Sequence, residues 1–242
     1  MMRVVLVFLL LAGLAGPVSA AGVSKTVAQY ARDMEEYYKN GKSEILPGLL
    51  RVFETQGVLA DGEKRLVTAA FLAEVLRRDP TARGRLLTGA GNFGDNARKT
   101  LAWAAHLACL ADRDTLLASF IRPGEDILAR QIKASPAPLE KWDIYSEPSV
   151  LRMYWAAFLA SGDARPLDAI IGAALRYADL NAAGLSGDAC FAVAAAAAAL
   201  LYEQAPHHRL VRVRLREELG KEPQNSPKAG TLRGILRDQS KL

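Results

Sequence analysis

The sequence has few of the side chains that bind metals or form nucleophile–base pairs. Two cysteines and three histidines occur in 242 residues. The histidines, His106, His207 and His208, assemble neither a catalytic triad nor a three-histidine metal site. Cys109 and Cys190 lie about 81 residues apart, which does not make a zinc motif. We therefore predict no metal and no cofactor.

Long uncharged apolar runs are absent after the N-terminus, which excludes an integral membrane protein because a span needs about 18 such residues. Arg3 precedes the short apolar run at 4–11, and small residues follow as far as Ala20 and Ala21, an order typical of a secretory signal peptide. No cysteine follows the run to accept a lipid. We predict a signal peptide at 1–20 and a periplasmic or secreted product, with an uncleaved N-terminal anchor as the alternative.

Export does not decide whether the two cysteines form a disulfide or remain free thiols. An oxidising compartment favours a disulfide between Cys109 and Cys190. Both lie in alanine-rich apolar stretches, however, where a buried free thiol acts as a small hydrophobic side chain. The sequence does not decide between pairing and two inert thiols.

Alternating apolar and polar residues with β-branched side chains are also absent, which argues against strands. Apolar residues between 23 and 37 instead recur at spacings of three and four until Asn40 and Gly41, as in an amphipathic helix. We predict an all-α protein of antiparallel helical hairpins, either an irregular solenoid resembling tetratricopeptide repeats or a bundle. Further helices are expected at 43–55, 61–79, 95–110, 114–121, 124–133, 149–160, 165–177, 188–202, 208–219 and 229–238.

One stretch departs from the helical pattern. Prolines 136, 138 and 148 exclude a regular helix over 134–148. We predict a single all-α domain at 21–242, which this stretch either divides or merely crosses at the surface. Trp103, Trp155 and Phe158 are the expected centre of its core, beside alanine-rich helices.

Three glycines, Gly89, Gly91 and Gly94, match the spacing of a dinucleotide-binding fingerprint. That motif works only where a buried strand delivers the glycines to a helix N-terminus. The chain shows no strand pattern here, so we predict a flexible corner between hairpins.

A second motif, Gly184 to Asp188, resembles a nucleophile elbow around Ser186. Asp188 replaces its second glycine, and a helical chain lacks the strand-to-helix turn that exposes such a serine. We predict that Ser186 is instead the N-cap of the alanine-rich helix.

The best acid–base candidates are Asp143 and Glu147, which accompany Trp142 and Tyr145 in the proline-rich stretch. Paired carboxylates beside aromatic rings are typical of a glycan-cleaving cleft. A surface loop that carries acids and aromatics only to cover the edge of a core is the simpler interpretation.

Positive charge is concentrated at the C-terminus, where residues 205–242 hold nine basic and four acidic side chains. Arg209, Arg212 and Arg216 fall on one stripe of a predicted helix. In an exported protein this face favours an acidic partner protein, an acidic envelope polymer or peripheral contact with anionic lipid, rather than nucleic acid. A solvated face without a partner is the alternative.

The segment from Trp155 through Phe158 to Asp163, in which an aromatic helix ends at a Gly-Asp corner, resembles a recurring segment of exported bacterial helical proteins. The similarity continues through the alanine-rich helix to about Arg216 and covers about a third of the chain. The resemblance implies hairpins like those of tetratricopeptide repeats and implies no activity.

Together these observations favour an exported helical scaffold, such as an immunity-type or adaptor protein, that binds a protein or an envelope component through Arg209, Arg212 and Arg216. The competing hypothesis is a cell-wall glycan hydrolase that uses Asp143 and Glu147.

Overall fold

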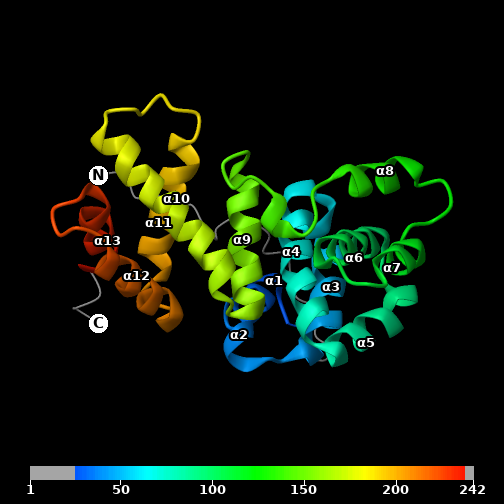
Figure 1. The fold of residues 1–242 in the computed structure, drawn as a ribbon. Helices are drawn as coiled ribbons and strands as arrows, with labels where there is room; N and C mark the ends of the chain where they lie inside the picture. Colours follow the sequence, from blue (N-terminus) through cyan, green and yellow to red (C-terminus); the bar gives the residue numbers. More distant parts are fainter. Residues whose placement is uncertain (1–24, 238–242) are drawn as a thin grey trace. The chain divides into compact units, whose positions relative to one another are not determined.

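The computed structural model describes residues 25–237, which form thirteen α-helices and four short 3₁₀ segments and contain no strand (Figure 1). The predicted all-α class is confirmed. Among the described residues, no helix has both the length and the hydropathy needed to cross a membrane. The predicted signal peptide at 1–20 lies outside the described residues.

The chain divides into two compact units. Unit 1 contains the described residues up to Leu139 together with 159–161, and unit 2 contains 140–158 and the described residues from 162 onward. The boundary at Leu139 lies within the proline-rich stretch 134–148.

Unit 1 is built around α4 and α6, which pack on each other along much of their length. Helices α3, α5, α7 and α8 surround this pair, and α1 packs on α3. The bounds are α1 Val27–Glu35, α2 Tyr37–Asn40, α3 Leu46–Thr55, α4 Gly62–Arg78, α5 Pro80–Thr88, α6 Asp95–Ala108, α7 Arg113–Phe120 and α8 Asp126–Ala134.

Unit 2 is built around α10, which packs on α11 and α13, and α13 also packs on α12. Its helices are α9 Pro148–Ser161, whose last three residues belong to unit 1, then α10 Ala164–Ala182, α11 Phe191–Gln204, α12 Arg209–Lys221 and α13 Pro227–Arg237.

Aspartates stand at both ends of the central helix α4, at the two residues that bound the helix expected over 61–79. The Asp61 carboxylate accepts hydrogen bonds from the backbone N–H groups of Glu63 and Lys64 at 2.9 and 3.1 Å. Asp79 ends α4 and then caps α5, because its carboxylate accepts from Ala82 N at 2.9 Å and Pro80 stands in the first turn. One residue therefore stops one helix and starts the next.

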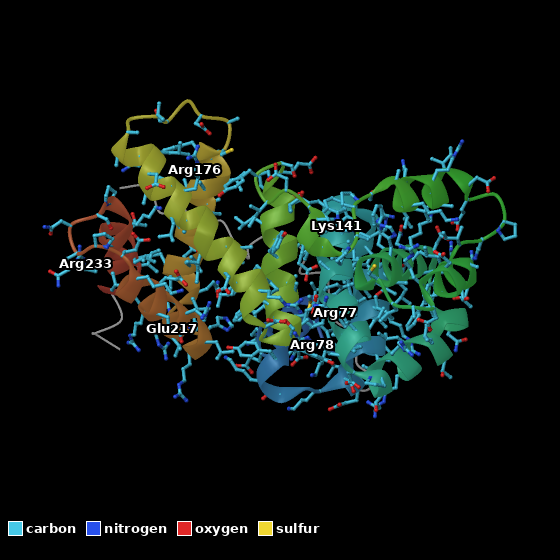
Figure 2. All side chains as sticks on the ribbon, in the orientation of Figure 1. Arg77, Arg78, Lys141, Arg176, Glu217 and Arg233 are labelled. Atoms are coloured by element: carbon cyan, nitrogen blue, oxygen red, sulfur yellow. The ribbon has the colours of Figure 1, made fainter. Side chains whose placement is uncertain are left out.

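The last turn of α4 carries two arginines, Arg77 and Arg78, where cations favour the helix dipole (Figure 2). Both pair with Glu74, a buried carboxylate one turn earlier, at 2.5 and 3.5 Å. The ion pairs compensate the cost of burying Glu74.

Alanine allows α4 and α6 to approach closely. Ala69, Ala70 and Ala73 of α4 and Ala102 and Ala105 of α6 are buried. The predicted core position is confirmed for Trp155 and Phe158, which are buried in unit 2 with ring centroids 5.1 Å apart.

The predicted core position is wrong for Trp103, which is half-exposed. The neighbouring alanines of α6 occupy the buried face, and each residue of a helix is turned about 100° from the next. Trp103 therefore shares its face with Lys99, one turn earlier, rather than with the alanines.

Gly48, in the first turn of α3, is required by the close approach of α1. A Cβ placed there would lie 2.1 Å from Tyr30 Oη and 3.1 Å from Tyr30 Cζ. Tyr30 is buried, so its ring has little room to move.

We expect Gly48→Ala to lower the free energy of unfolding by about 1–3 kcal/mol because of this overlap. Gly84→Ala in α5 is the matched control, since a Cβ there meets nothing within 4 Å and alanine raises helix propensity by up to about 1 kcal/mol. Urea unfolding of both variants and of the Gly48→Ala/Tyr30→Phe pair measures the effect. A stabilised Gly48→Ala variant would contradict it.

Candidate functional site

Unit 1 contains an open groove of about 480 Å³ between α4, α6 and α8. Its wall carries apolar, cationic and amide side chains together. The lining residues are Gly62, Arg65, Leu66, Lys99, Trp103, Glu125, Ile127, Leu128 and Gln131.

Four of these side chains give the groove an apolar surface. Trp103, Leu66 and Leu128 are half-exposed, and Ile127 is 66% exposed. No other large hydrophobic side chain in the described part of the chain is exposed to that extent. Exposure of single apolar residues is ordinary. A half-exposed tryptophan and a largely exposed isoleucine in one concave surface, however, indicate a surface that binds a ligand or partner.

The cations of the groove differ in their pairing. Lys99 Nζ lies 2.5 Å from Asp95 and 3.7 Å from Glu125, so its charge is compensated. Arg65 is half-buried, and its guanidinium has no hydrogen-bond or ion-pair partner among the described residues. Gly62 lies beside that guanidinium, because a Cβ at position 62 would be 3.7 Å from Arg65 Nη2.

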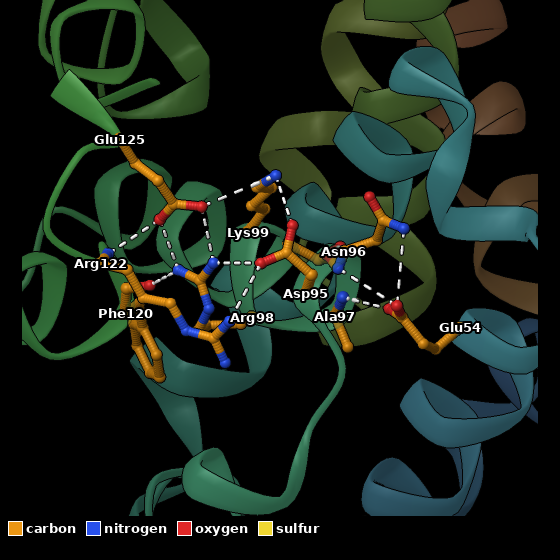
Figure 3. A network of polar contacts seen from close by, with 10 residues as sticks. Glu54, Asp95, Asn96, Ala97, Arg98, Lys99, Phe120, Arg122 and Glu125 are labelled. Carbon is orange, nitrogen blue, oxygen red and sulfur yellow. Dashed lines mark hydrogen bonds and ion pairs between the residues drawn. The ribbon is translucent and has the colours of Figure 1, made fainter. Parts of the chain in front are cut away.

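A polar network at the N-terminal end of α6 forms one edge of the groove (Figure 3). Its centre is Arg98, which is 5% exposed. The guanidinium donates to both oxygens of Glu125 at 2.7 and 2.8 Å, to Asp95, and to the backbone carbonyl of Phe120. Arg98 thereby joins α6 to the end of α7 and to the residue that precedes α8.

The network keeps its carboxylates ionised. Hydrogen bonds from Lys99 and Arg98 lower the pKa of Asp95 to about 2. The hydrogen bond from Arg98, with a smaller contribution from the backbone N–H of Arg122, lowers the pKa of Glu125 to about 2. Groove and network together hold four cations and two carboxylates, a net positive charge of two: Arg65, Arg98, Lys99 and Arg122 against Asp95 and Glu125.

The glycine motif forms a corner, as predicted. Gly89 ends α5, a 3₁₀ turn follows, and Gly94 is the N-cap of α6. The helix N-terminus, where a bound phosphate would lie, is occupied by Glu54 of α3, which accepts from the N–H groups of Asn96 and Ala97 at 3.3 and 2.5 Å (Figure 3). A Cβ at Gly94 would be 2.6 Å from the Glu54 carboxylate, so glycine at this position leaves the room that Glu54 needs to cap α6.

Asp143 and Glu147 are exposed, and each serves its own local turn. Asp143 accepts from the backbone N–H of Tyr145 at 3.0 Å. Glu147 precedes α9 and accepts from the Ser149 hydroxyl at 3.0 Å. The two carboxylates accept from different partners, and their pairing in catalysis stays a prediction.

The predicted basic stripe on α12 contains two different kinds of arginine. Arg209 and Arg216 are exposed and have no partner among the described residues. Arg212 instead donates to the carbonyls of Ala205 and Pro206 at 2.9 and 2.8 Å, beside the end of α11. Arg212 is thus a capping residue, and we exclude it from the free cationic surface.

Ser186 does not cap the alanine-rich helix, so that prediction is wrong. Helix α11 begins at Phe191, five residues later. Before that point Asp188 closes a turn, accepting from Cys190 N at 2.8 Å. The helix therefore begins only after this aspartate turn.

The two cysteines are free thiols in the structure. Cys109 is exposed at the C-cap of α6, in a left-handed conformation with φ of 51°, which contradicts the alternative in which it is a buried inert thiol. Cys190 is half-exposed at the start of α11.

His106 is buried on α6, as its apolar neighbours predict, with Nε2 3.0 Å from the Ser135 carbonyl. Burial lowers the pKa of this imidazole. His208 is buried at the N-cap of α12, against Trp155 with ring centroids 5.3 Å apart. In the part of the chain that the structure describes, no three His, Cys, Asp or Glu side chains form a group able to hold a metal ion.

The groove was not predicted from the sequence, although two signals point to it. Lys99 and Trp103 are four residues apart on one helix, which places a cation and an aromatic ring on the same face. Ile127 lies in the first turn of α8, a helix that buries only Ile132. The partnerless state of Arg65 depends on its surroundings in space and has no sequence signature.

Compared with known proteins, the chain matches no family model, no curated protein and no solved structure. Its resemblance to exported bacterial helical proteins therefore stays a prediction.

Proposed function

We propose that the protein is an exported helical scaffold, with hairpins like those of tetratricopeptide repeats, which binds an acidic partner protein through α12. The observation that carries this proposal is the composition of the exposed α12 face. Two free guanidinium groups, those of Arg209 and Arg216, lie on the same helix as the exposed apolar side chains of Leu210 and Val213. Spacings of four and three place Arg209, Val213 and Arg216 on one stripe.

This arrangement has the character of a protein interface. An apolar centre gains most from being removed from water, whereas exposed arginines around it attract acidic residues and orient the partner. Lipid contact alone would be better served by a larger apolar surface or a longer basic cluster than two arginines provide. A protein with acidic residues around an apolar centre is therefore the favoured partner.

The remaining basic residues of α12 support the helix. Arg214 binds Asp168 of α10 through two nitrogens at 3.0 and 2.7 Å and also pairs with Glu217 (Figure 2). Arg214, together with Arg212, which binds the carbonyls beside the end of α11, fixes α12 within unit 2. Reversing the charge of these two residues would disturb the fold, which makes them unsuitable for a binding test.

The test reverses the charge of the two free arginines. Affinity capture from envelope extract identifies partners of the wild-type protein, and titration calorimetry with each purified partner measures Kd. We expect Arg209→Glu/Arg216→Glu to weaken binding by at least about 10-fold, since two attractive contacts become repulsive. Lys141→Glu, an exposed lysine of unit 2 outside α12, is the matched control for the single variants Arg209→Glu and Arg216→Glu, since each changes the net charge by the same amount (Figure 2).

Unchanged affinity in the double variant would reject the α12 face as the binding surface. If Lys141→Glu weakens binding as much as Arg209→Glu or Arg216→Glu does alone, net charge controls binding, which also rejects the α12 face. Binding of the wild-type protein to anionic vesicles and to no protein would assign the two arginines to the membrane surface instead.

A further inference from the structure

The groove of unit 1 has two features that the fold does not use. One is Arg65, a half-buried cation without a partner among the described residues. The other is the apolar wall of Trp103, Leu66, Leu128 and the strongly exposed Ile127. Desolvating a guanidinium partially without compensating its charge costs free energy, as does exposing a large apolar side chain to water. A single ligand can remove both costs.

We propose that this groove binds a small amphiphilic carboxylate, with the anionic head on Arg65 and the apolar tail over Trp103 and Ile127. The proposal is independent of the α12 surface, because every lining residue belongs to unit 1. The planar guanidinium of arginine matches a carboxylate through two parallel hydrogen bonds. The indole ring and the aliphatic side chains supply the contact surface for the tail.

The charge balance of the groove favours a head group with one negative charge. Lys99 is already neutralised by Asp95 and Glu125, which leaves Arg65 as the cation open to a ligand. Glu125 also lines the groove, and Arg98 holds it in place and ionised. A second negative charge on the ligand would meet this fixed carboxylate, so phosphate monoesters and clusters of acidic residues are disfavoured.

The size of the groove favours a small molecule over a peptide. A volume of about 480 Å³ lies within the range of sites for single ligands, about 300–1,000 Å³. An extended peptide would also require partners for its backbone N–H and C=O groups. The neutral polar side chains that line the groove are Gln131 and the indole of Trp103, too few for several peptide units.

Titration with decanoate, with tryptophan fluorescence as the signal, tests the proposal. Trp103 is the tryptophan of the groove, and Trp142 and Trp155 belong to unit 2. We expect a saturable change with half-saturation below about 1 mM, which Trp103→Phe removes. Decylamine, with the same tail and the opposite charge, should bind at least about 10-fold more weakly, and calorimetry gives affinities without relying on fluorescence.

Arg65→Gln is expected to weaken decanoate binding by about 10-fold or more, because the amide keeps hydrogen bonding but loses the charge. Arg130→Gln is the matched control on α8, since Arg130 is exposed, unpaired among the described residues and outside the groove. Neither arginine side chain makes a hydrogen bond or ion pair with the described residues, so both variants should melt like the wild-type protein. Arg209→Glu/Arg216→Glu should leave decanoate binding unchanged, which separates this test from that of the proposed function.

Four results would overturn the proposal. The first is no saturation below about 5 mM. The second is equal binding of decanoate and decylamine, and the third is equal loss in Arg65→Gln and Arg130→Gln. Either of these two indicates non-specific adsorption. The fourth is tighter binding of an acetylated Leu-Glu-Glu-Leu peptide than of decanoate, which would assign the groove to a protein partner.

Discussion

Arg98→Met is expected to lower the free energy of unfolding of unit 1 by about 2–4 kcal/mol. Methionine fills much of the same volume, so the loss comes from the polar contacts of the guanidinium. The Phe120 carbonyl loses its buried donor, and Glu125, which is only 19% exposed, loses the cation that compensates it. Asp95 is 45% exposed and can be rehydrated, which keeps the cost below that of a fully buried pair.

Lys99→Met is the matched control for Arg98→Met. Lys99 is the next residue on α6 and pairs with the same two carboxylates, but its side chain is 25% exposed and donates to no backbone carbonyl. Its removal should cost less than about 1 kcal/mol. Urea unfolding, followed by circular dichroism, gives both values. Equal losses in the two variants would contradict a special role for the buried guanidinium.

The sequence predicts the helices because their signals are local. Apolar residues at spacings of three and four, aspartates at helix starts and glycines at helix ends act within one or two turns. Asp61, Asp79 and Gly41 mark ends that the structure confirms. The wrong N-cap at Ser186 has a local cause as well, because the Asp188 side chain closes a turn on Cys190 N and α11 begins only after that turn.

The candidate site is less predictable because its properties arise between helices. Glu54 is a polar residue at the end of α3 in the sequence, and only the approach of α6 makes it the cap of another helix. Arg98 is buried because α7 and the segment before α8 enclose it, and contacts between separate helices leave no local sequence pattern. Trp103 was expected in the core by its hydrophobicity, whereas the alanines beside it take the interface that permits the closest approach.

Arg98, together with Lys99, sets the expected acid sensitivity of the network in unit 1. Asp95 and Glu125 have pKa values of about 2 in the folded chain, below their ordinary values of 3.8 and 4.5. Above about pH 5 both groups are ionised in the folded and unfolded states, so their stabilising contribution is complete. As the pH falls from 5 towards 2, the unfolded chain binds protons first, and the free energy of unfolding decreases.

The Glu125 contribution is expected to reach about 1–3 kcal/mol, and the more exposed Asp95 adds less than about 1 kcal/mol. In Arg98→Met the main cause of the low Glu125 pKa is gone, so this variant should lose less stability than the wild-type protein between pH 5 and pH 2.

The difference between the two pH profiles isolates the network, because the other carboxylates titrate in both proteins. Urea unfolding at intervals of half a pH unit measures it. Parallel profiles would show that Arg98 does not control the ionisation of Glu125, whereas profiles that converge at low pH would identify the ion pair as the acid-labile contact beside the groove.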